Sequence, residues 1–239
     1  MKSILSLTVL SLLLQCGNLN EILEQSPGVL FEDTTPTDIE INKGLKAALE
    51  VGINKGVSKL SAQNGFLENP EIKIPFPKDA EKVAETLKDI GLGSKVDEVV
   101  TSLNRAAENA VQKALPLFKN AIYDMSFSDV KTILFGNDTA ATAYLKRKTR
   151  NDLIQTFKPD IQKSLDQVNA TKHWEGVMST YNKIPLVNKV ETDLSTYVSK
   201  KAINALFLEV RKQEASIREN PLERTTDLLK KVFNYAENQ

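Results

Sequence analysis

Apolar side chains return every three or four positions along nearly all of the chain from residue 38 to the C-terminus. This spacing is typical of helices that bury one face, whereas a half-buried strand would alternate every second residue. Prolines, glycines and capping residues separate the periodic segments, in place of the two-residue turns of hairpins. The pattern predicts an all-α fold, a compact array of about seven or eight helices.

The ends of the expected helices are marked by caps and by helix-breaking residues. Thr37 is a typical N-cap for the first helix, and Pro116 lies inside the third, where we expect it to kink the helix. The fifth segment has two expected weak points, one near Thr149 and one before Pro159. The predicted ranges are 38–61, 78–90, 95–125, 128–135, 139–168, 172–183, 193–219 and 222–236.

One stretch between the first two predicted helices does not follow the helical period. Residues 69–77 contain three prolines, and Ile72, Ile74 and Phe76 alternate with polar or imino residues. The alternation places these three side chains on one side of an extended segment, and the prolines exclude a central strand. We expect an extended strap that packs over the helices as a belt. The alternative is a strap that closes one wall of a cleft.

The first fifteen residues have the pattern of an export signal. Lys2 precedes an apolar run that is too short to cross a bilayer as a permanent helix. The run ends at Cys16, the only cysteine of the chain. Leu13 and Cys16 resemble a bacterial lipoprotein box, in which the cysteine is diacylated, although Gln15 stands where that pattern has a small residue. The alternative is an ordinary signal peptide with a chance cysteine.

A lipidated Cys16 would hold the protein on a membrane, since two acyl chains give stable anchoring. Gly17 is not the aspartate that favours retention at the inner membrane, so the resemblance implies the outer membrane, facing the periplasm. Residues 17–37 are polar and aperiodic, and as a flexible coil they would reach roughly 25 Å. We therefore expect a signal peptide at 1–15, an anchor and tether at 16–37 and a single helical domain at 38–239.

Charge and rare residues narrow the classes of function. Lys and Arg together number 31, as do Asp and Glu, so the chain offers no positive field for nucleic acid. One cysteine and one histidine, His173, allow neither an intramolecular disulfide nor a paired-imidazole or thiolate metal site. Glycine-rich phosphate loops and a G-x-S-x-G phrase are absent. We expect no catalytic residue, no metal and no cofactor.

Two predicted helix starts carry side chains that could bind an anion, because the first N–H groups of a helix are unpaired. The residues are Asp138, Thr139 and Thr142 at one start and Arg224, Thr225 and Asp227 at the other. If the two starts meet in space, Arg224, Thr139 and Thr142 would hold a carboxylate or a phosphate. The alternative is that Asp138 and one of the two threonines after Arg224 simply cap their helices.

A third polar group lies beside the apolar stripe of the third predicted helix. Asn104, Arg105 and Glu108 fall within one turn, and Arg105 and Glu108 have the spacing of a helical ion pair. We expect a polar network that holds the helices in register, with ligand binding as the alternative. Tyr144 and Arg147 lie one turn apart on the fifth segment and could join either arrangement.

Four phrases of the chain resemble one known family. They occupy residues 65–77, 103–108, 136–142 and 224–233. In this order they resemble the bacterial domain-of-unknown-function family 4197, over about residues 40 to 233. The resemblance implies a bacterial origin, frequent export and no established activity, so it assigns no catalytic residue.

The features together favour a non-enzymatic envelope lipoprotein that binds a small apolar or anionic ligand or another envelope protein. The alternative is a cofactor-independent enzyme with a polar site around Arg105, Asp138 and Arg224. In an enzyme or a carrier these side chains would converge on an enclosed pocket and leave a carboxylate unpaired. In a partner-binding module they would be buried as satisfied pairs, and an apolar patch would be exposed.

Overall fold

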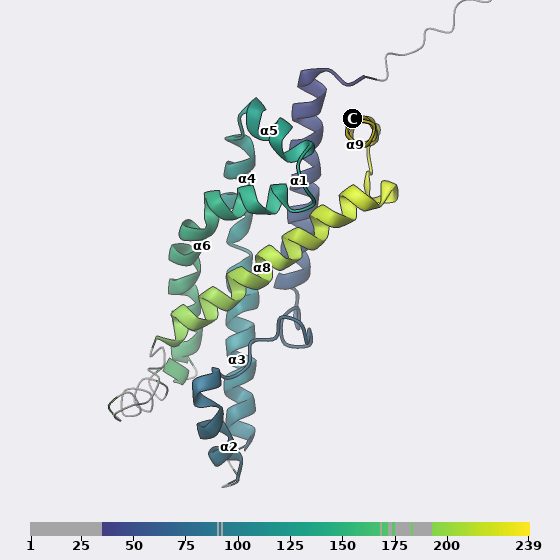
Figure 1. Ribbon diagram of the computed structural model, residues 1–239. Helices are drawn as coiled ribbons and strands as arrows, with labels where there is room; N and C mark the ends of the chain where they lie inside the picture. The colour runs from purple at the N-terminus through teal and green to yellow at the C-terminus, as the bar shows by residue number, and fades with distance from the viewer. Residues whose placement is uncertain are drawn as a thin grey trace, which may run out of the picture. The chain divides into compact units, whose positions relative to one another are not determined.

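Helices account for most of the described chain in the computed structural model (Figure 1), and no strand occurs among the described residues. The structure describes residues 35–89, 91, 93–167, 169–171, 174, 183 and 193–239. The predicted all-α class is confirmed. The predicted leader, Cys16, the tether before residue 35, His173 and most of the predicted helix at 172–183 lie outside the described residues.

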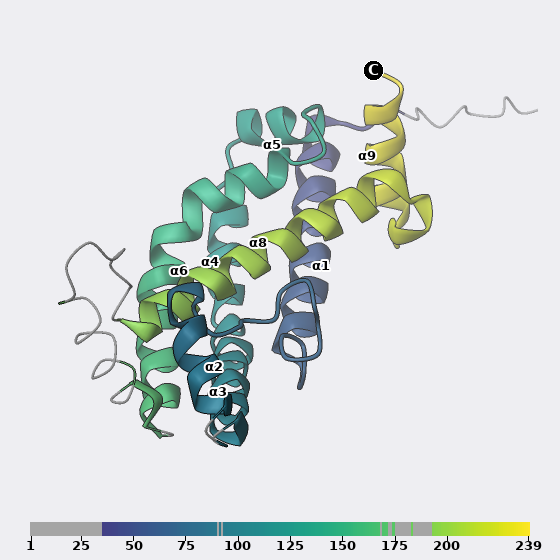
Figure 2. The ribbon, with the colours of Figure 1, turned by 60° about the horizontal axis from the view of Figure 1, so that its bottom comes forward.

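The α-helices lie close to the predicted ranges, with two short 3-10 helices between them. Their bounds are α1 Asp38–Ser61, η1 Lys78–Ala80, α2 Glu81–Asp89, α3 Gly93–Val111, α4 Ala114–Tyr123, α5 Phe127–Leu134, α6 Ala140–Gln167, α8 Leu194–Glu219, η2 Pro221–Glu223 and α9 Asp227–Glu237. α8 packs against α1, α3 and α6, and both ribbon views show it crossing α1 (Figures 1 and 2). α9 packs against α1, and α5 packs between α1 and α6.

The core lies where these helices cross. Its largest fully buried apolar side chains include Phe66, Phe118, Phe157, Leu103 and Leu145. Full burial of one such side chain contributes about 1.5–3 kcal/mol, so the apolar stripes are the main source of the fold's stability. Helix propensity alone would not hold segments of this length in a helical conformation.

α1 begins at the predicted N-cap. The Thr37 hydroxyl accepts a hydrogen bond from the Glu40 amide at 3.2 Å, and the Glu40 carboxylate accepts one from the Thr37 amide at 2.8 Å. This reciprocal capping box satisfies two of the free N–H groups of the helix. Farther along α1, a Cβ on Gly44 would lie 2.8 Å from Cγ2 of Val232, so the glycine permits the close approach of α9.

The prediction of one kinked helix over 95–125 is wrong. α3 ends at Val111, and α4 starts at Ala114 after a turn at Gln112 and Lys113. Pro116 is the third residue of α4, where its missing N–H would have had no partner within the helix. The proline therefore belongs to a new helix start and does not interrupt a longer helix.

The two breaks expected in the fifth segment do not occur. α6 runs without interruption from Ala140 to Gln167 with Pro159 inside it. The Thr149 hydroxyl donates to the Leu145 carbonyl at 2.8 Å, one turn earlier, so it is satisfied within the helix. The cost of an internal proline is about 3 kcal/mol, and the buried side chains of α6, which pack on α8, α3 and α4, offset it.

The C-terminal segment starts differently from the predicted 222–236 helix. Pro221–Glu223 form a 3-10 turn, and α9 starts only at Asp227. The Thr226 hydroxyl accepts from the Leu229 amide at 3.2 Å, so Thr226 is the N-cap. Of the two threonines considered, Thr226 caps the helix.

The strap lies against α3 as a belt. Asn104 accepts a hydrogen bond from the Ile74 amide at 2.8 Å and donates to the Ile74 carbonyl at 2.9 Å. Its side-chain amide also donates to the Val100 carbonyl at 2.7 Å. Asn104 and Ile74 are both fully buried. One side-chain amide therefore satisfies the backbone of an extended segment that has no strand beside it.

We expect Asn104→Ala to lower the free energy of unfolding by about 3 kcal/mol, because it leaves buried N–H and C=O groups of Ile74 unpaired. The change is measured by urea denaturation followed by circular dichroism. Asn151→Ala, at an exposed position of α6, is the matched control and should change stability by less than about 0.5 kcal/mol. Equal unfolding midpoints for the two variants would contradict the role of Asn104.

Candidate functional site

Arg105 and Glu108 hold the turn that precedes the strap. The Arg105 guanidinium donates to Glu108 at 2.6 Å and also to the Asn64 side chain. The other oxygen of Glu108 accepts from the amides of Phe66 and Leu67 at 3.1 and 3.3 Å. Asn104, Arg105 and Glu108 therefore join α3 to this turn and to the strap.

A buried carboxylate occupies the first of the two helix starts. Glu214 of α8 accepts from the Ala141 amide at 2.9 Å with one oxygen. Its other oxygen accepts from the amide of Thr142 at 2.9 Å and from its hydroxyl at 2.7 Å. Because these are the free N–H groups at the start of α6, Glu214 takes the place of the external anion considered for this site.

Arg218 completes the Glu214 site and connects it to α5. Its guanidinium pairs with Glu214 at 3.2 Å and donates to the carbonyls of Ile133 and Leu134 at 2.7 and 3.3 Å. These carbonyls end α5, where a cation is stabilised by the helix dipole. One ion pair on α8 therefore joins the end of α5 to the start of α6.

The expectation that Asp138 caps the helix is wrong. In the turn before α6, the side-chain oxygen of Asn137 accepts from the amide and the hydroxyl of Thr139 at 3.1 and 3.0 Å. Glu214 binds the next free amides of α6, so no backbone donor remains for Asp138. Asp138 is exposed and directed toward a groove described below.

Arg224 is buried at the second helix start, with 1% of its surface exposed. Its guanidinium donates to the carbonyls of Ile217 and Arg218 at 3.2 and 2.7 Å, where α8 ends. It also donates to Asn234 at 2.9 Å and pairs with Glu237, both on α9. Arg224 thus fastens α9 to the end of α8.

The structure does not bring Arg224, Thr139 and Thr142 together around a ligand, because their hydrogen bonds go to separate internal partners. Of the other candidates, Thr225 is exposed, and Asp227 pairs with Lys230 at 3.2 Å on the surface.

Tyr144 and Arg147 lie one turn apart on α6, where the Tyr144 side chain is buried and Arg147 is exposed. The Arg147 guanidinium lies 5.4 Å from the centre of the Tyr144 ring. The Tyr144 hydroxyl donates to the Ala121 carbonyl at 3.2 Å, and burial raises the pKa of the phenol above its usual value. The two residues join neither the strap network nor the helix starts.

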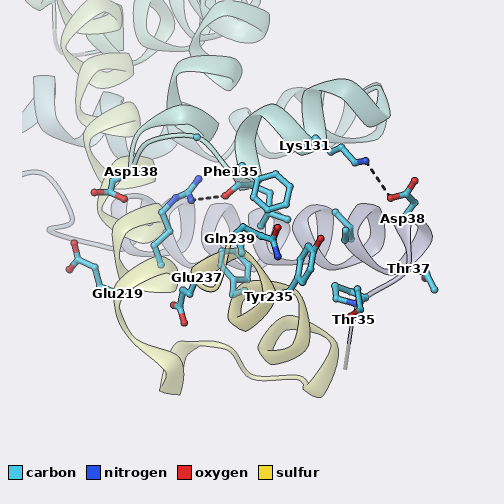
Figure 3. Close-up of a pocket in the computed structure, with 17 residues that line it drawn as sticks. Thr35, Thr37, Asp38, Lys131, Phe135, Asp138, Glu219, Tyr235, Glu237 and Gln239 are labelled. Carbon is cyan, nitrogen blue, oxygen red and sulfur yellow. Dashed lines mark hydrogen bonds and ion pairs between the residues drawn. The ribbon is translucent and has the colours of Figure 1, made fainter. Parts of the chain in front are cut away.

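An open groove of about 1000 Å³ lies between the start of α1, the end of α5, the end of α8 and α9 (Figure 3). We call it the α5–α9 groove. The side chains used below to describe it are Asp38, Lys131, Phe135, Asp138, Glu219, Tyr235 and Glu237. Figure 3 shows Asp138 and Glu219 at one end, Asp38 and Lys131 at the other, and Phe135 and Tyr235 between them.

The lining of the groove combines aromatic rings with charges. The rings of Phe135 and Tyr235 meet edge to face with their centres 6.1 Å apart, and Phe135 is 45% exposed. Asp38 lies 3.5 Å from Lys131, and Glu237 pairs with Arg224. The groove therefore presents apolar surface beside charged groups that are partly neutralised.

Glu40 lies in the first turn of α1, close to Thr37, which lines the groove. Hydrogen bonds from the Thr37 amide and from Lys231, followed by the Thr37 hydroxyl, lower the pKa of Glu40 to about 2. Lys231 lies on α9, 3.0 Å from the Glu40 carboxylate. The carboxylate is therefore ionised at neutral pH, and it joins the start of α1 to α9.

Glu214, Arg218 and the aromatic residues of the groove were not among the candidates identified from the sequence. Glu214 and Arg218 have the i,i+4 spacing of a helical ion pair, which is a local signal, but surface pairs have the same spacing. Phe135 and Tyr235 fit the apolar stripes of their helices and gave no sign of exposure.

Comparison with known families gives one match. A family described as "Protein of unknown function (DUF4197)" matches residues 35–234. The chain belongs to this family. All four phrases that carry the resemblance lie inside the region matched by the DUF4197 family. No curated protein and no solved structure matches the chain.

None of the helices among the described residues combines the length and the apolar composition required to span a membrane. No group of three or more His, Cys, Asp or Glu side chains within this part of the chain is placed to share a metal ion.

We expect Glu214→Gln to lower the free energy of unfolding by about 3 kcal/mol, because the new amide group would face a buried donor and Arg218 would lose its counter-charge. The unfolding midpoint in urea measures the change. Glu219→Gln is the same substitution at an exposed position of the same helix and should leave stability within about 0.5 kcal/mol. A Glu214→Gln variant as stable as the Glu219→Gln variant would refute the role of Glu214.

Proposed function

We propose that this protein is an exported, lipid-anchored envelope protein whose helical domain binds a partner protein through the α5–α9 groove, without catalysis. The observation that carries the proposal is the contrast between two sets of polar residues. The buried polar side chains bind partners within the domain itself. The exposed polar side chains line an open groove that also contains aromatic rings.

The buried set has the character expected of a structural framework. Arg105, Glu214 and Arg224 each bind backbone groups or opposite charges of the domain itself. Among the described residues, no buried side-chain nitrogen or oxygen lacks a hydrogen-bond partner. An active site would instead leave a polar group aimed at the space for substrate, so this distribution supports binding over catalysis.

The groove has the character expected of a protein-binding surface. Aromatic side chains are frequent among the residues that contribute most to interfaces, and Phe135 and Tyr235 line the groove. The groove is half open, whereas small ligands favour enclosed sites that bury about 70–90% of their surface. This shape favours a segment of another protein as the occupant.

The anchor follows from the sequence. The apolar run ends at Cys16, and Thr35, which lines the groove, lies 19 residues after it in the chain. In the proposal, lipidated Cys16 holds the domain at the outer membrane on the periplasmic side. The partner is then another protein of the envelope, within the roughly 25 Å reach of the tether.

Photo-crosslinking in the bacterial host tests the groove. A photoreactive benzoyl-phenylalanine in place of Phe135 should give a discrete adduct with one partner protein, because Phe135 faces the groove. The adduct is measured by immunoblot and identified by mass spectrometry. Tyr123, which is 68% exposed and outside the groove lining, is the matched aromatic control position. Equal adducts from both positions, or none from Phe135, would refute the groove as the binding surface.

Fractionation of cells tests the anchor. We expect Cys16→Ser to move the protein out of the membrane fraction and to abolish labelling with a palmitate analogue, because the acyl chains supply the membrane affinity. Gln15→Ala places a small residue before the cysteine and should keep both properties, which makes it the matched control. Membrane retention of an unlabelled Cys16→Ser protein would show that the anchor lies elsewhere.

A further inference from the structure

We propose that the segment bound in the α5–α9 groove is basic, with a lysine or arginine next to an apolar side chain. The proposal rests on the proposed function, because it gives the chemistry of the partner at the same surface. The charges of the groove and the position of its aromatic rings carry the argument.

One end of the groove has uncompensated negative charge. Asp138 and Glu219 line it, and neither side chain has an ion-pair or hydrogen-bond partner among the described residues. The other charged groups of the lining are already paired: Lys131 lies near Asp38, Arg218 binds Glu214, and Arg224 binds Glu237. Two exposed carboxylates therefore remain for a cation from outside.

Apolar surface lies directly beside these carboxylates. Phe135 and Tyr235 occupy the middle of the groove, next to the end that holds Asp138 and Glu219 (Figure 3). Leu134 and Ala236 add aliphatic surface to the lining. A basic residue that reached the carboxylates would therefore place its neighbour in the segment against the aromatic rings.

An anionic occupant does not fit the same surface. The start of α6, which would attract an anion, is filled by Glu214. The Arg224 guanidinium is buried and directed toward α9, and Arg218 is directed toward α5 and Glu214. No cation of the lining is left without a counter-charge, so an anion would meet Asp138 and Glu219 unopposed.

The segment that precedes the domain in the chain is also a poor match in charge. Residues 17–34 contain Glu21, Glu24, Glu32 and Asp33 and no lysine or arginine. Like charges at an interface are unfavourable. A segment of another protein, with the opposite charge, is therefore the occupant that the groove favours.

Peptide binding to the purified domain with its tether tests this chemistry. The probe is a short fluorescein-labelled peptide that alternates lysine with leucine and phenylalanine, and fluorescence anisotropy measures its dissociation constant. Two further peptides carry glutamine or glutamate in place of every lysine. We expect the lysine peptide to bind about tenfold more tightly than the glutamine peptide, and high salt to remove most of this difference.

Substitutions place the effect in the groove. Asp138→Asn with Glu219→Gln should weaken binding of the lysine peptide about tenfold, since each carboxylate contributes one exposed ion pair. Both side chains are exposed, so the variant should fold as the parent does. Asp97→Asn with Asp152→Asn removes the same charge from exposed positions outside the groove and should leave binding unchanged.

The outcomes separate the proposed partner chemistry from the proposed function. If the glutamine or glutamate peptide binds as tightly, and Phe135→Ala abolishes that binding, the groove binds segments but the basic partner is wrong. If the groove variants bind the lysine peptide as the parent does, the groove is not its site and the proposal fails. Concentration-dependent dimerisation that disappears in Asp138→Asn with Glu219→Gln would identify a second copy as the occupant and would also overturn it.

Discussion

The arrangement of the helices depends on one buried carboxylate. Glu214 binds the free amides at the start of α6, and Arg218 on the same helix binds both Glu214 and the last carbonyls of α5. A charge inside a protein is strongly unfavourable unless all its partners are in place. The end of α5, the start of α6 and the end of α8 consequently have one arrangement in which both charges and the backbone groups that they bind are hydrogen-bonded. That arrangement also forms the wall of the α5–α9 groove that carries Phe135 and Asp138.

The same principle governs the other buried polar groups. Asn104 supplies hydrogen bonds to the strap, Glu108 supplies them to the turn before it, and Arg224 binds the carbonyls that end α8. In each case a side chain substitutes for missing backbone partners at an irregular point of the fold. These residues are therefore unavailable to a ligand, although their types and spacing resemble those of a binding site. Asp138 and Glu219, which line the groove, have no such internal partner among the described residues.

The spacing of the apolar residues predicted a helix correctly where tertiary packing and the local preference of the residues favour the same helix. α1 matches the predicted range and begins at the predicted N-cap Thr37, and the structure adds the reciprocal bond of Glu40. The prolines were misjudged in two ways. Pro116 lies in the first turn of a helix, whereas Pro159 lies within one whose buried side chains pack on neighbouring helices. The effect of a proline depends on its position relative to a helix start and on the packing of the helix. Neighbouring residues in the sequence indicate the helix start, whereas the packing depends on distant parts of the chain.

The sequence by itself determined the helical class, the N-cap of α1 and the membership of the chain in its family. These depend on spacings of a few residues, which a helix converts directly into neighbouring positions. The tertiary structure decided which polar residues meet. Glu214 lies 73 positions from Ala141, and Arg105 lies 41 positions from Asn64, so no local spacing relates them. It also decided that Asp138 and Glu219 share an open groove, because helix crossings, and not periodicity, bring the ends of distant helices together.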